Sequence, residues 1–139
     1  MILLDTDHLS ILRGDPSERR TRLVTHLSAA ADEEIGTTIV TVEEQFRGWL
    51  ALIAQQRPAR RQVLPYDELA RLIDFFADYS IARFSPEAAD LFESFSKIRI
   101  GTADRKIAAI AIVSDALLLT ANRRDFEKVP GLRFENWMD

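Results

Sequence analysis

Residues 1–10 have the sequence MILLDTDHLS, in which the apolar run Ile2–Leu4 is followed at once by Asp5 and Asp7. A short apolar run that stops at acid is typical of a buried strand with a polar end. An aspartate in this place is also a good N-cap, so a short helix is expected over residues 8–13. The opening stretch therefore predicts a strand that leads through acid into a helix.

The same alternation continues along the chain. Apolar or β-branched runs predict strands, and apolar residues at helical spacing predict helices. Thr41 is expected to cap the third helix, and the basic segment 57–61 is expected to separate two helices. The expected strands are 2–4, 37–40, 81–84, 117–120 and 132–134; the expected helices are 8–13, 17–31, 42–56, 66–79, 86–97 and 103–114. This order predicts one α/β domain over residues 1–139, with a mostly parallel sheet and helices on both faces.

Composition limits the chemistry that the chain can perform. Hydrophobic residues make up 47% of the 139 residues and charged residues 29%, which is the profile of a folded globular protein. There is no cysteine, so disulfides and cysteine-based zinc sites are excluded. With two histidines only, a metal site would be built from oxygen ligands, which suit Mg²⁺ or Mn²⁺.

Charge and hydropathy bear on location and partners. The net charge of -4 argues weakly against nucleic-acid binding, although metal-binding carboxylates contribute to it. No signal peptide precedes the first strand, and the longest apolar run, 107–113, is too short to cross a bilayer. We therefore expect a cytoplasmic protein with no membrane partner.

Acidic residues occupy several strand ends and helix starts. Asp5 follows the first strand, and Glu44 and Asp104 are expected in the first turns of helices. Asn122 and Asp125 follow the strand at 117–120. A parallel sheet brings such places to one edge, where a divalent cation offsets the repulsion between carboxylates. Carboxylate-bound cations of this kind are suited to phosphodiester hydrolysis.

Each acid also has a purely structural interpretation. Asp5 could be only a helix cap, and either Glu43 or Glu44 should be a solvated charge. Asp104 could be only a favourable acid in a first helical turn. Asp125 fits a turn or a supporting role better than direct contact with a metal. The metal-site hypothesis therefore depends on the set of acids together.

Four segments carry a family resemblance. They are LLDTDHLS with Asp5, TIVTVEEQFRG with Thr41 and Glu44, IGTADRKIAAIAI with Asp104, and the closing LLLTANRRDFEKVPGLRFENW. In this order and at these separations, the sequence resembles the PIN-domain ribonucleases, specifically the VapC-type toxins of toxin–antitoxin pairs. The resemblance extends over essentially the whole chain.

The resemblance implies a three-layer α/β/α domain and an endoribonuclease that depends on Mg²⁺ or Mn²⁺. It implies a homodimer that a cognate VapB-type antitoxin inhibits. It makes Asp5, Glu44 and Asp104 the catalytic metal ligands. The supporting polar groups would be Thr6, Thr120, Asn122 and Asp125. Asn122 stands where the family has a fourth acid, which puts a second metal in doubt, and Asp7 stands where the family often has asparagine.

Basic and aromatic residues suggest further contacts. Arg123 and Arg124 lie beside the expected site and are candidates for binding RNA. The arginines of the 57–61 segment are better explained as solvated charges, and His8 as a structural residue. The helices at 42–56 and 66–79 offer a groove for an antitoxin helix. The phenylalanines at helical spacing belong to the core or to such a groove: Phe75, Phe76, Phe92 and Phe95.

Three rival functions are weighed against the nuclease. A haloacid-dehalogenase-type phosphatase would share the acids at 5 and 7, but Leu9 stands where threonine or valine is needed, and the later Asp-Asp pair is absent. A phosphoacceptor receiver domain would need an aspartate before Thr41, which is also absent. A nuclease-dead RNA-binding PIN module remains open because of Asn122.

Overall fold

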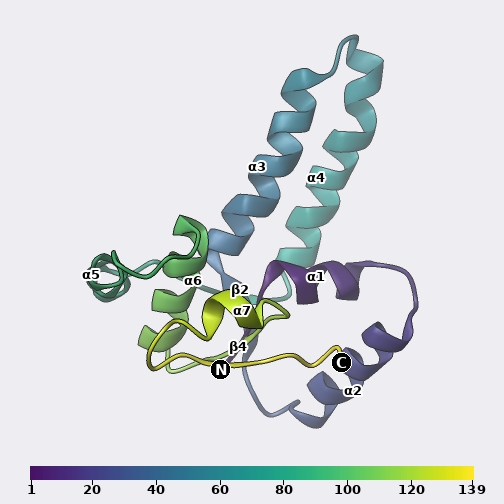
Figure 1. Cartoon of the computed structure of the whole chain (residues 1–139). Coiled ribbons are helices and arrows are strands. Elements are labelled where there is room, and N and C mark those ends of the chain that lie inside the picture. Colours follow the sequence, from purple (N-terminus) through teal and green to yellow (C-terminus); the bar gives the residue numbers. More distant parts are fainter.

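The computed structural model describes residues 1–139 as a sheet of five short strands with seven α-helices and one 3₁₀-helix around it (Figure 1). The elements are β1 Ile2–Leu4, α1 Thr6–Arg13, α2 Glu18–Ala29, β2 Ile35–Thr38, α3 Ile39–Gln55, η1 Ala59–Gln62, α4 Val63–Phe76, β3 Ser80–Ala82, α5 Pro86–Ser94, α6 Thr102–Val113, β4 Leu117–Leu119, α7 Arg123–Phe126 and β5 Arg133–Glu135. No helix combines the length and the apolar character needed to cross a bilayer.

The strands are all parallel and lie in the order β3–β2–β1–β4–β5. The chain thus builds the sheet outward from β1, first through β2 and β3 and then on the other side through β4 and β5. In such sheets the crevice at the carboxyl ends of the strands, where the winding direction changes, is the usual place for a ligand. Here that place lies between β1 and β4.

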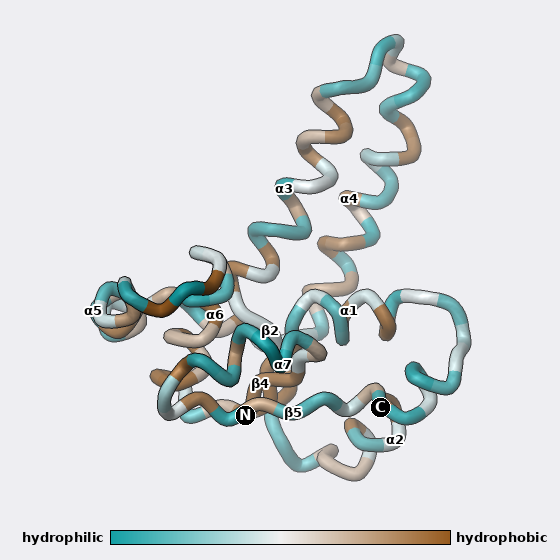
Figure 2. The backbone as a smooth tube through the Cα atoms, viewed as in Figure 1, coloured by the Kyte–Doolittle hydropathy of each residue, from teal (hydrophilic) through white to brown (hydrophobic).

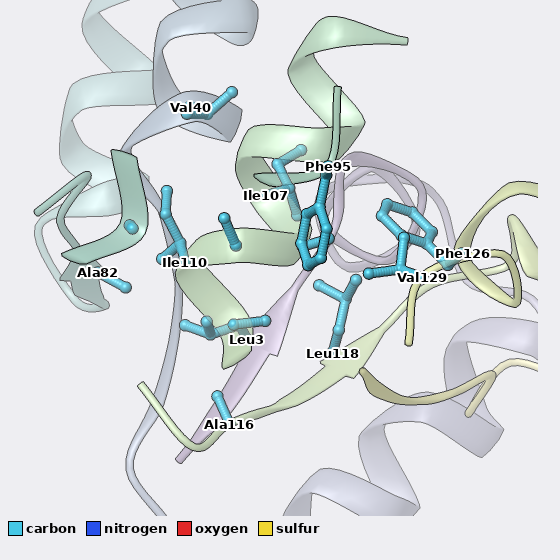
Figure 3. Close-up of a cluster of buried hydrophobic side chains, with 14 residues drawn as sticks. Leu3, Val40, Ala82, Phe95, Ile107, Ile110, Ala116, Leu118, Phe126 and Val129 are labelled. Atoms are coloured by element: carbon cyan, nitrogen blue, oxygen red, sulfur yellow. The ribbon is translucent and has the colours of Figure 1, made fainter. Parts of the chain in front are cut away.

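Two hydrophobic cores cover the two faces of the sheet. Successive strand side chains alternate between faces, so Leu3 and Leu118 enter one core, while Ile2, Leu4 and Leu119 enter the other. The first core includes α5, α6 and α7 (Figure 3), and the second includes α1, α2 and the sheet-proximal parts of α3 and α4. The expected three-layer α/β/α arrangement is confirmed.

The helices α3 and α4 form a hairpin whose outer half projects away from the sheet, with η1 at its tip (Figure 1). The lower half belongs to the core, because Val42, Leu72 and Phe76 are buried there. The expected core role of the phenylalanines is confirmed: Phe76 and Phe95 are buried, and Phe75 and Phe92 pack against the two cores.

The start of α3 differs from the prediction. Strand β2 covers 35–38 instead of 37–40, and α3 begins at Ile39. Thr38 is the N-cap, since its Oγ1 accepts the Thr41 N–H at 3.1 Å and pairs with Thr41 Oγ1 at 3.0 Å. The β-branched residues Ile39 and Val40 suggested a strand, but the buried cap Thr38 directly before them starts a helix instead. Glu44 therefore lies beyond the first helical turn, and the prediction that it lies in that turn is wrong.

The short helices η1 and α7 were not predicted, and the remaining differences are at element ends. Helix α4 starts three residues earlier than expected, after η1 forms in the basic segment, and α5 ends at Ser94 instead of 97. The last strand is 133–135 instead of 132–134. Helix ends depend on capping contacts, which periodicity does not specify.

Candidate active site

Asp5 lies where β1 ends and α1 begins. Its Oδ1 accepts the Thr6 N–H at 2.8 Å, so it is indeed the N-cap of α1. Its Oδ2 accepts a hydrogen bond from Thr120 Oγ1 at 2.9 Å, which comes from the end of β4, the neighbouring strand. With these two contacts Asp5 is only 8% exposed, and it lies at the carboxyl ends of β1 and β4, where the winding direction of the sheet changes. Thr6 contributes to the site through its backbone N–H.

Three carboxylates from different elements influence one another. Burial, followed by the charge of Asp7 and, more weakly, Asp104, raises the pKa of Asp5 to about 6. Lost hydration and the charges of Asp5 and Glu43 raise the pKa of Glu44. Burial and the charge of Glu44 raise the pKa of Asp104. The fold thus brings Asp5, Glu44 and Asp104 within electrostatic range of one another.

The structure also distinguishes the two adjacent glutamates. Glu43 is paired with Arg47 one turn along α3, with Oε2 2.5 Å from Nη2, and this pair is exposed. Glu44 carries the electrostatic link to Asp5 and Asp104. Both side chains are exposed, so the two differ in their neighbours: Glu43 pairs with Arg47, and Glu44 faces Asp5 and Asp104.

Asn122 braces the remaining acids. It caps α7, and its Nδ2 donates to Asp104 Oδ2 at 3.4 Å and to Asp125 Oδ2 at 3.3 Å. Asp125 in turn lies 3.6 Å from Lys128 Nζ. An amide donor between two carboxylates holds them apart without adding negative charge, which an aspartate in this position would do. Asp125 thus has a supporting place at the edge of the site.

Carboxylate oxygens are suitable ligands for a hard cation, but in this structure they do not form a complete coordination site. None of Asp5, Glu44 and Asp104 forms an ion pair with lysine or arginine. No group of three His, Cys, Asp or Glu side chains is close enough together to hold a metal ion. Unpaired carboxylates with raised pKa values fit a divalent cation chemically, and binding it would require the side chains to close around it.

The sequence did not predict the hydrogen bonds that Asp7 and His8 make with distant parts of the chain. Asp7 Oδ2 accepts the Ala121 N–H at 2.8 Å, and Asp7 Oδ1 lies 2.5 Å from His8 Nδ1. The other ring nitrogen of His8 accepts the Trp137 N–H at 3.2 Å, so Nδ1 carries the proton that is donated to Asp7. Burial raises the pKa of Asp7, but the His8 and Ala121 hydrogen bonds outweigh it and hold the pKa low.

The hydrogen bond between His8 and the Trp137 N–H connects the C-terminal tail to α1, next to Asp7. The expectation that His8 is structural agrees with its complete burial and its two hydrogen bonds. Its partner Trp137 lies 129 residues away, and no sequence spacing pointed to it. The only local signal was the unusual acid at position 7 next to a histidine.

The two candidate RNA-binding arginines are exposed on α7. Neither Arg123 nor Arg124 makes a side-chain hydrogen bond or ion pair in the structure, in contrast to most arginines of the chain. Their guanidinium groups are therefore available next to Asn122 and Asp125.

The chain was compared with known families and structures. The family model described as PIN domain matches residues 2–132. No curated protein sequence matches the chain. Among solved structures, FitAcB from Neisseria gonorrhoeae is similar at 25% identity, with 99% of each chain covered and a TM-score of 0.69.

Two further solved structures share the fold at lower identity. VapBC-1 from nontypeable Haemophilus influenzae has 18% identity, 100% of each chain covered and a TM-score of 0.75. A toxin–antitoxin complex from Klebsiella pneumoniae has 20% identity, 95% of each chain covered and a TM-score of 0.65. The arrangement of strands and helices is therefore shared with several bacterial complexes.

Proposed function

The chain belongs to the PIN-domain family, and on that premise we propose that it is an endoribonuclease that depends on Mg²⁺ or Mn²⁺. Asp5, Glu44 and Asp104 are the proposed catalytic residues and metal ligands. The observation that carries the proposal is that burial, together with the charges of neighbouring acids, raises the pKa of each of these three carboxylates, and that none of them has a basic partner. A divalent cation bound to them would lower the pKa of a bound water and neutralise charge on the scissile phosphate.

The supporting residues keep these carboxylates in place. Thr120 donates to Asp5 and so holds it ionised and oriented beside β4. Asn122 donates to both Asp104 and Asp125, which fixes Asp104 relative to the last motif. Arg123 and Arg124 are proposed to contact RNA phosphates, because unpaired guanidinium groups form bidentate bonds with phosphate oxygens.

Cleavage of total RNA by the purified protein tests the nuclease proposal. The wild-type protein should cut RNA with Mn²⁺ or Mg²⁺ and stop when EDTA is added. Asp5→Ala and Asp104→Asn should each lose at least about 100-fold of that activity, the order expected for groups that stabilise the transition state. Asp90→Asn is the matched control, because Asp90 is exposed on α5 and forms no hydrogen bond or ion pair through its side chain. Equal cleavage by wild type and Asp5→Ala would contradict the proposal.

A nuclease-dead RNA-binding module is the second candidate. It is favoured by Asn122, which replaces a fourth acid, and by the incomplete grouping of the three carboxylates. Isothermal titration with MnCl₂ separates the candidates. The nuclease should bind Mn²⁺, and Asp5→Asn should weaken that binding, whereas the binding module should take up no Mn²⁺ while it still retains RNA.

We further propose that the protein is a VapC-type toxin, a homodimer inhibited by a cognate antitoxin. The similar structures of VapBC-1 and of a toxin–antitoxin complex support an antitoxin partner. The α3–α4 hairpin has apolar segments alternating with polar ones along both helices (Figure 2). Several of its apolar side chains are more than half exposed: Leu50, Val63, Leu64, Tyr66 and Ile73. An amphipathic antitoxin helix would bury this surface.

Hydrogen exchange tests the docking surface. The proposed cognate antitoxin is the probe, and α3 and α4 should be the segments that it protects. Leu50→Glu should weaken that complex by at least about tenfold, since it places a charge in an apolar interface. Arg60→Glu at the hairpin tip serves as the control. Protection of other surfaces, with α3 and α4 unchanged, would contradict this docking site.

A further inference from the structure

A cavity of about 380 Å³ opens beside the proposed catalytic centre, between the end of β4 and the C-terminal tail. Building on the proposed function, we propose that this cavity holds one nucleotide of the RNA next to the scissile phosphate, with its phosphate at Arg123 and an amino-bearing base against the tail. The volume is within the range of ordinary small-ligand sites. The cavity is lined by Thr120, Ala121, Arg123, Phe134, Glu135, Asn136 and Asp139.

Thr120 places the cavity next to the catalytic carboxylates. It lines the cavity and its hydroxyl group also donates to Asp5 at 2.9 Å. The Ala121 N–H, from the next lining residue, is bound to Asp7. The cavity is thus next to the residue that holds the Asp5 carboxylate, so we place its occupant beside the proposed cleavage site.

Charge is distributed unevenly around the cavity. Arg123 is the one basic residue of its lining, and it has no hydrogen bond or ion pair of its own. Glu135 and Asp139 stand on the tail side, where Asp139 is paired with Arg19 at 3.3 Å and Glu135 has no basic partner. Carboxylates repel a phosphate, whereas a free guanidinium group attracts one, so the phosphate end of a nucleotide belongs on the Arg123 side.

The tail side suits a base. Phe134 is partly exposed and offers an aromatic surface, and aromatic surfaces stack on bases of any sequence. Glu135, Asn136 and Asp139 line this side with side-chain oxygens, of which Glu135 Oε1 has no hydrogen-bond partner and is free to accept an N–H group. Guanine, adenine and cytosine carry an amino group, whereas uracil presents one N–H between two carbonyl oxygens that carboxylates would repel. The cavity should therefore prefer amino-bearing bases.

The wall formed by the tail is braced from within. Asn136 Nδ2 donates to Asp139 Oδ2 at 2.9 Å, and Asn136 Oδ1 accepts the Met138 N–H at 2.9 Å. Trp137 Nε1 donates to Glu135 Oε2 at 2.6 Å, and the Trp137 N–H is held by His8. A wall held by this many contacts is preorganised, which lowers the entropic cost of binding.

Nucleotide titration followed by NMR tests the cavity without any cleavage. The four nucleoside 5′-monophosphates are added in EDTA, with ribose 5-phosphate and inorganic phosphate as controls. GMP, AMP or CMP should shift the amide signals of Thr120, Ala121 and Asn136 with a Kd on the order of 1 mM, and UMP should bind more weakly. Arg123→Ala should weaken binding by about tenfold, Arg123→Lys should weaken it less, and Arg60→Ala should leave it unchanged.

The outcomes separate this inference from the nuclease proposal. If the wild-type protein cuts no RNA but the amino-bearing nucleotides shift these amide signals, nucleotide binding in the cavity is supported and the nuclease proposal is contradicted. If RNA is cut while no nucleotide shifts them, or while ribose 5-phosphate shifts them equally, the inference is overturned and the nuclease stands. A preference for UMP would also overturn it. In an active enzyme, Arg123→Ala should weaken cleavage about equally whichever base lies beside the cut, because Arg123 is proposed to contact the phosphate.

Discussion

Asp5 is buried at the carboxyl end of β1, where loss of hydration and neighbouring acids raise its pKa to about 6. An ionised carboxylate in this place opposes folding unless a cation balances it. The same property that makes Asp5 a good metal ligand therefore makes the metal-free protein less stable. Residues at functional sites often carry such a cost in stability.

The pH dependence of stability should reveal this cost. The pKa of Asp5 is higher in the folded protein than in the unfolded chain, so its stabilising effect is complete below pH 3.8 and is lost as pH rises through about 6. Asp5→Asn should therefore stabilise the metal-free protein at pH 7.5, by an amount on the order of 3 kcal/mol at most, and have little effect near pH 4. Urea unfolding in EDTA at both pH values measures the difference.

Asp90→Asn provides the control for this prediction. Its side chain is exposed, so it should change stability equally and slightly at both pH values. If Asp5→Asn destabilised the protein at pH 7.5, the hydrogen bonds of the Asp5 carboxylate would stabilise it more than burial destabilises it. The ionised carboxylate would then carry no cost in stability.

Asp7 and His8 make a second prediction at this scale. In Asp7→Asn, the amide oxygen would keep the Ala121 N–H, which turns the amide NH₂ toward His8. His8 would then have to accept at Nδ1 and carry its proton on Nε2, opposite the Trp137 N–H. Two donors facing each other in a buried site should cost about 1–3 kcal/mol in urea unfolding.

The matched control for Asp7→Asn is Asp15→Asn, an exposed aspartate in the loop after α1. A double variant that also carries His8→Gln should recover part of the loss, because the glutamine amide can turn either group toward residue 7. An unchanged stability in Asp7→Asn alone would show that asparagine fits this place and that the acid is not required for holding the tail.

At the scale of elements, β2 has two close contacts, one with the start of α3 and one with the neighbouring strand β3. Thr38 ends the strand and caps α3, which sets the direction in which α3 leaves and hence the place of Glu44. Gly36 allows β2 to approach β3, because a Cβ at this position would lie 2.1 Å from the Ser80 carbonyl oxygen. Both residues act on the site through the backbone that they position.

Two glycine variants should have opposite effects. Gly36→Ala should push β2 and β3 apart and destabilise the protein by about 2–4 kcal/mol. Gly48→Ala should stabilise it by about 0.5–1 kcal/mol, because Gly48 is exposed inside α3 with no atom within 4 Å of an added Cβ. Urea unfolding measures both, and a neutral Gly36→Ala would contradict the close approach of the strands.

At the scale of the whole molecule, the last residues close the fold. Met138 is 1% exposed within the core that includes β1 and α2, and its carbonyl oxygen accepts the Arg22 Nε at 2.7 Å. Trp137 stacks on His26 with 5.3 Å between ring centroids. Figure 1 shows the C-terminus beside α2. The tail thus joins α2 to the floor of the proposed active site.

Substitution of Met138 tests how far the fold depends on its tail. Met138→Ala should cost about 2–4 kcal/mol through the cavity that it leaves, and Met138→Leu, which keeps the volume, should cost under about 1.5 kcal/mol. Unfolding in urea can be followed by circular dichroism, and Trp49→Phe leaves Trp137 as the one fluorescent tryptophan for following the tail itself. Equal stability of the alanine and leucine variants would mean that the tail does not contribute to the core.

Local sequence patterns by themselves determined most of the elements and the acids that mark the site. Short apolar runs, helical spacing and caps depend on residues close together in the chain, so five strands and the longer helices could be predicted with errors at their ends. The edge at which Asp5, Glu44 and Asp104 meet also followed from the sequence, because parallel strands bring their carboxyl ends together.

Tertiary structure alone decided the contacts between distant residues. The Thr38 cap replaced Thr41 because the strand pairing of β2 buries its hydroxyl group against the first turn of α3. The link from His8 to Trp137 and the cavity beside Thr120 depend on how the helices and the tail pack on the sheet. Such contacts depend on the packing of the whole chain, which no local pattern encodes.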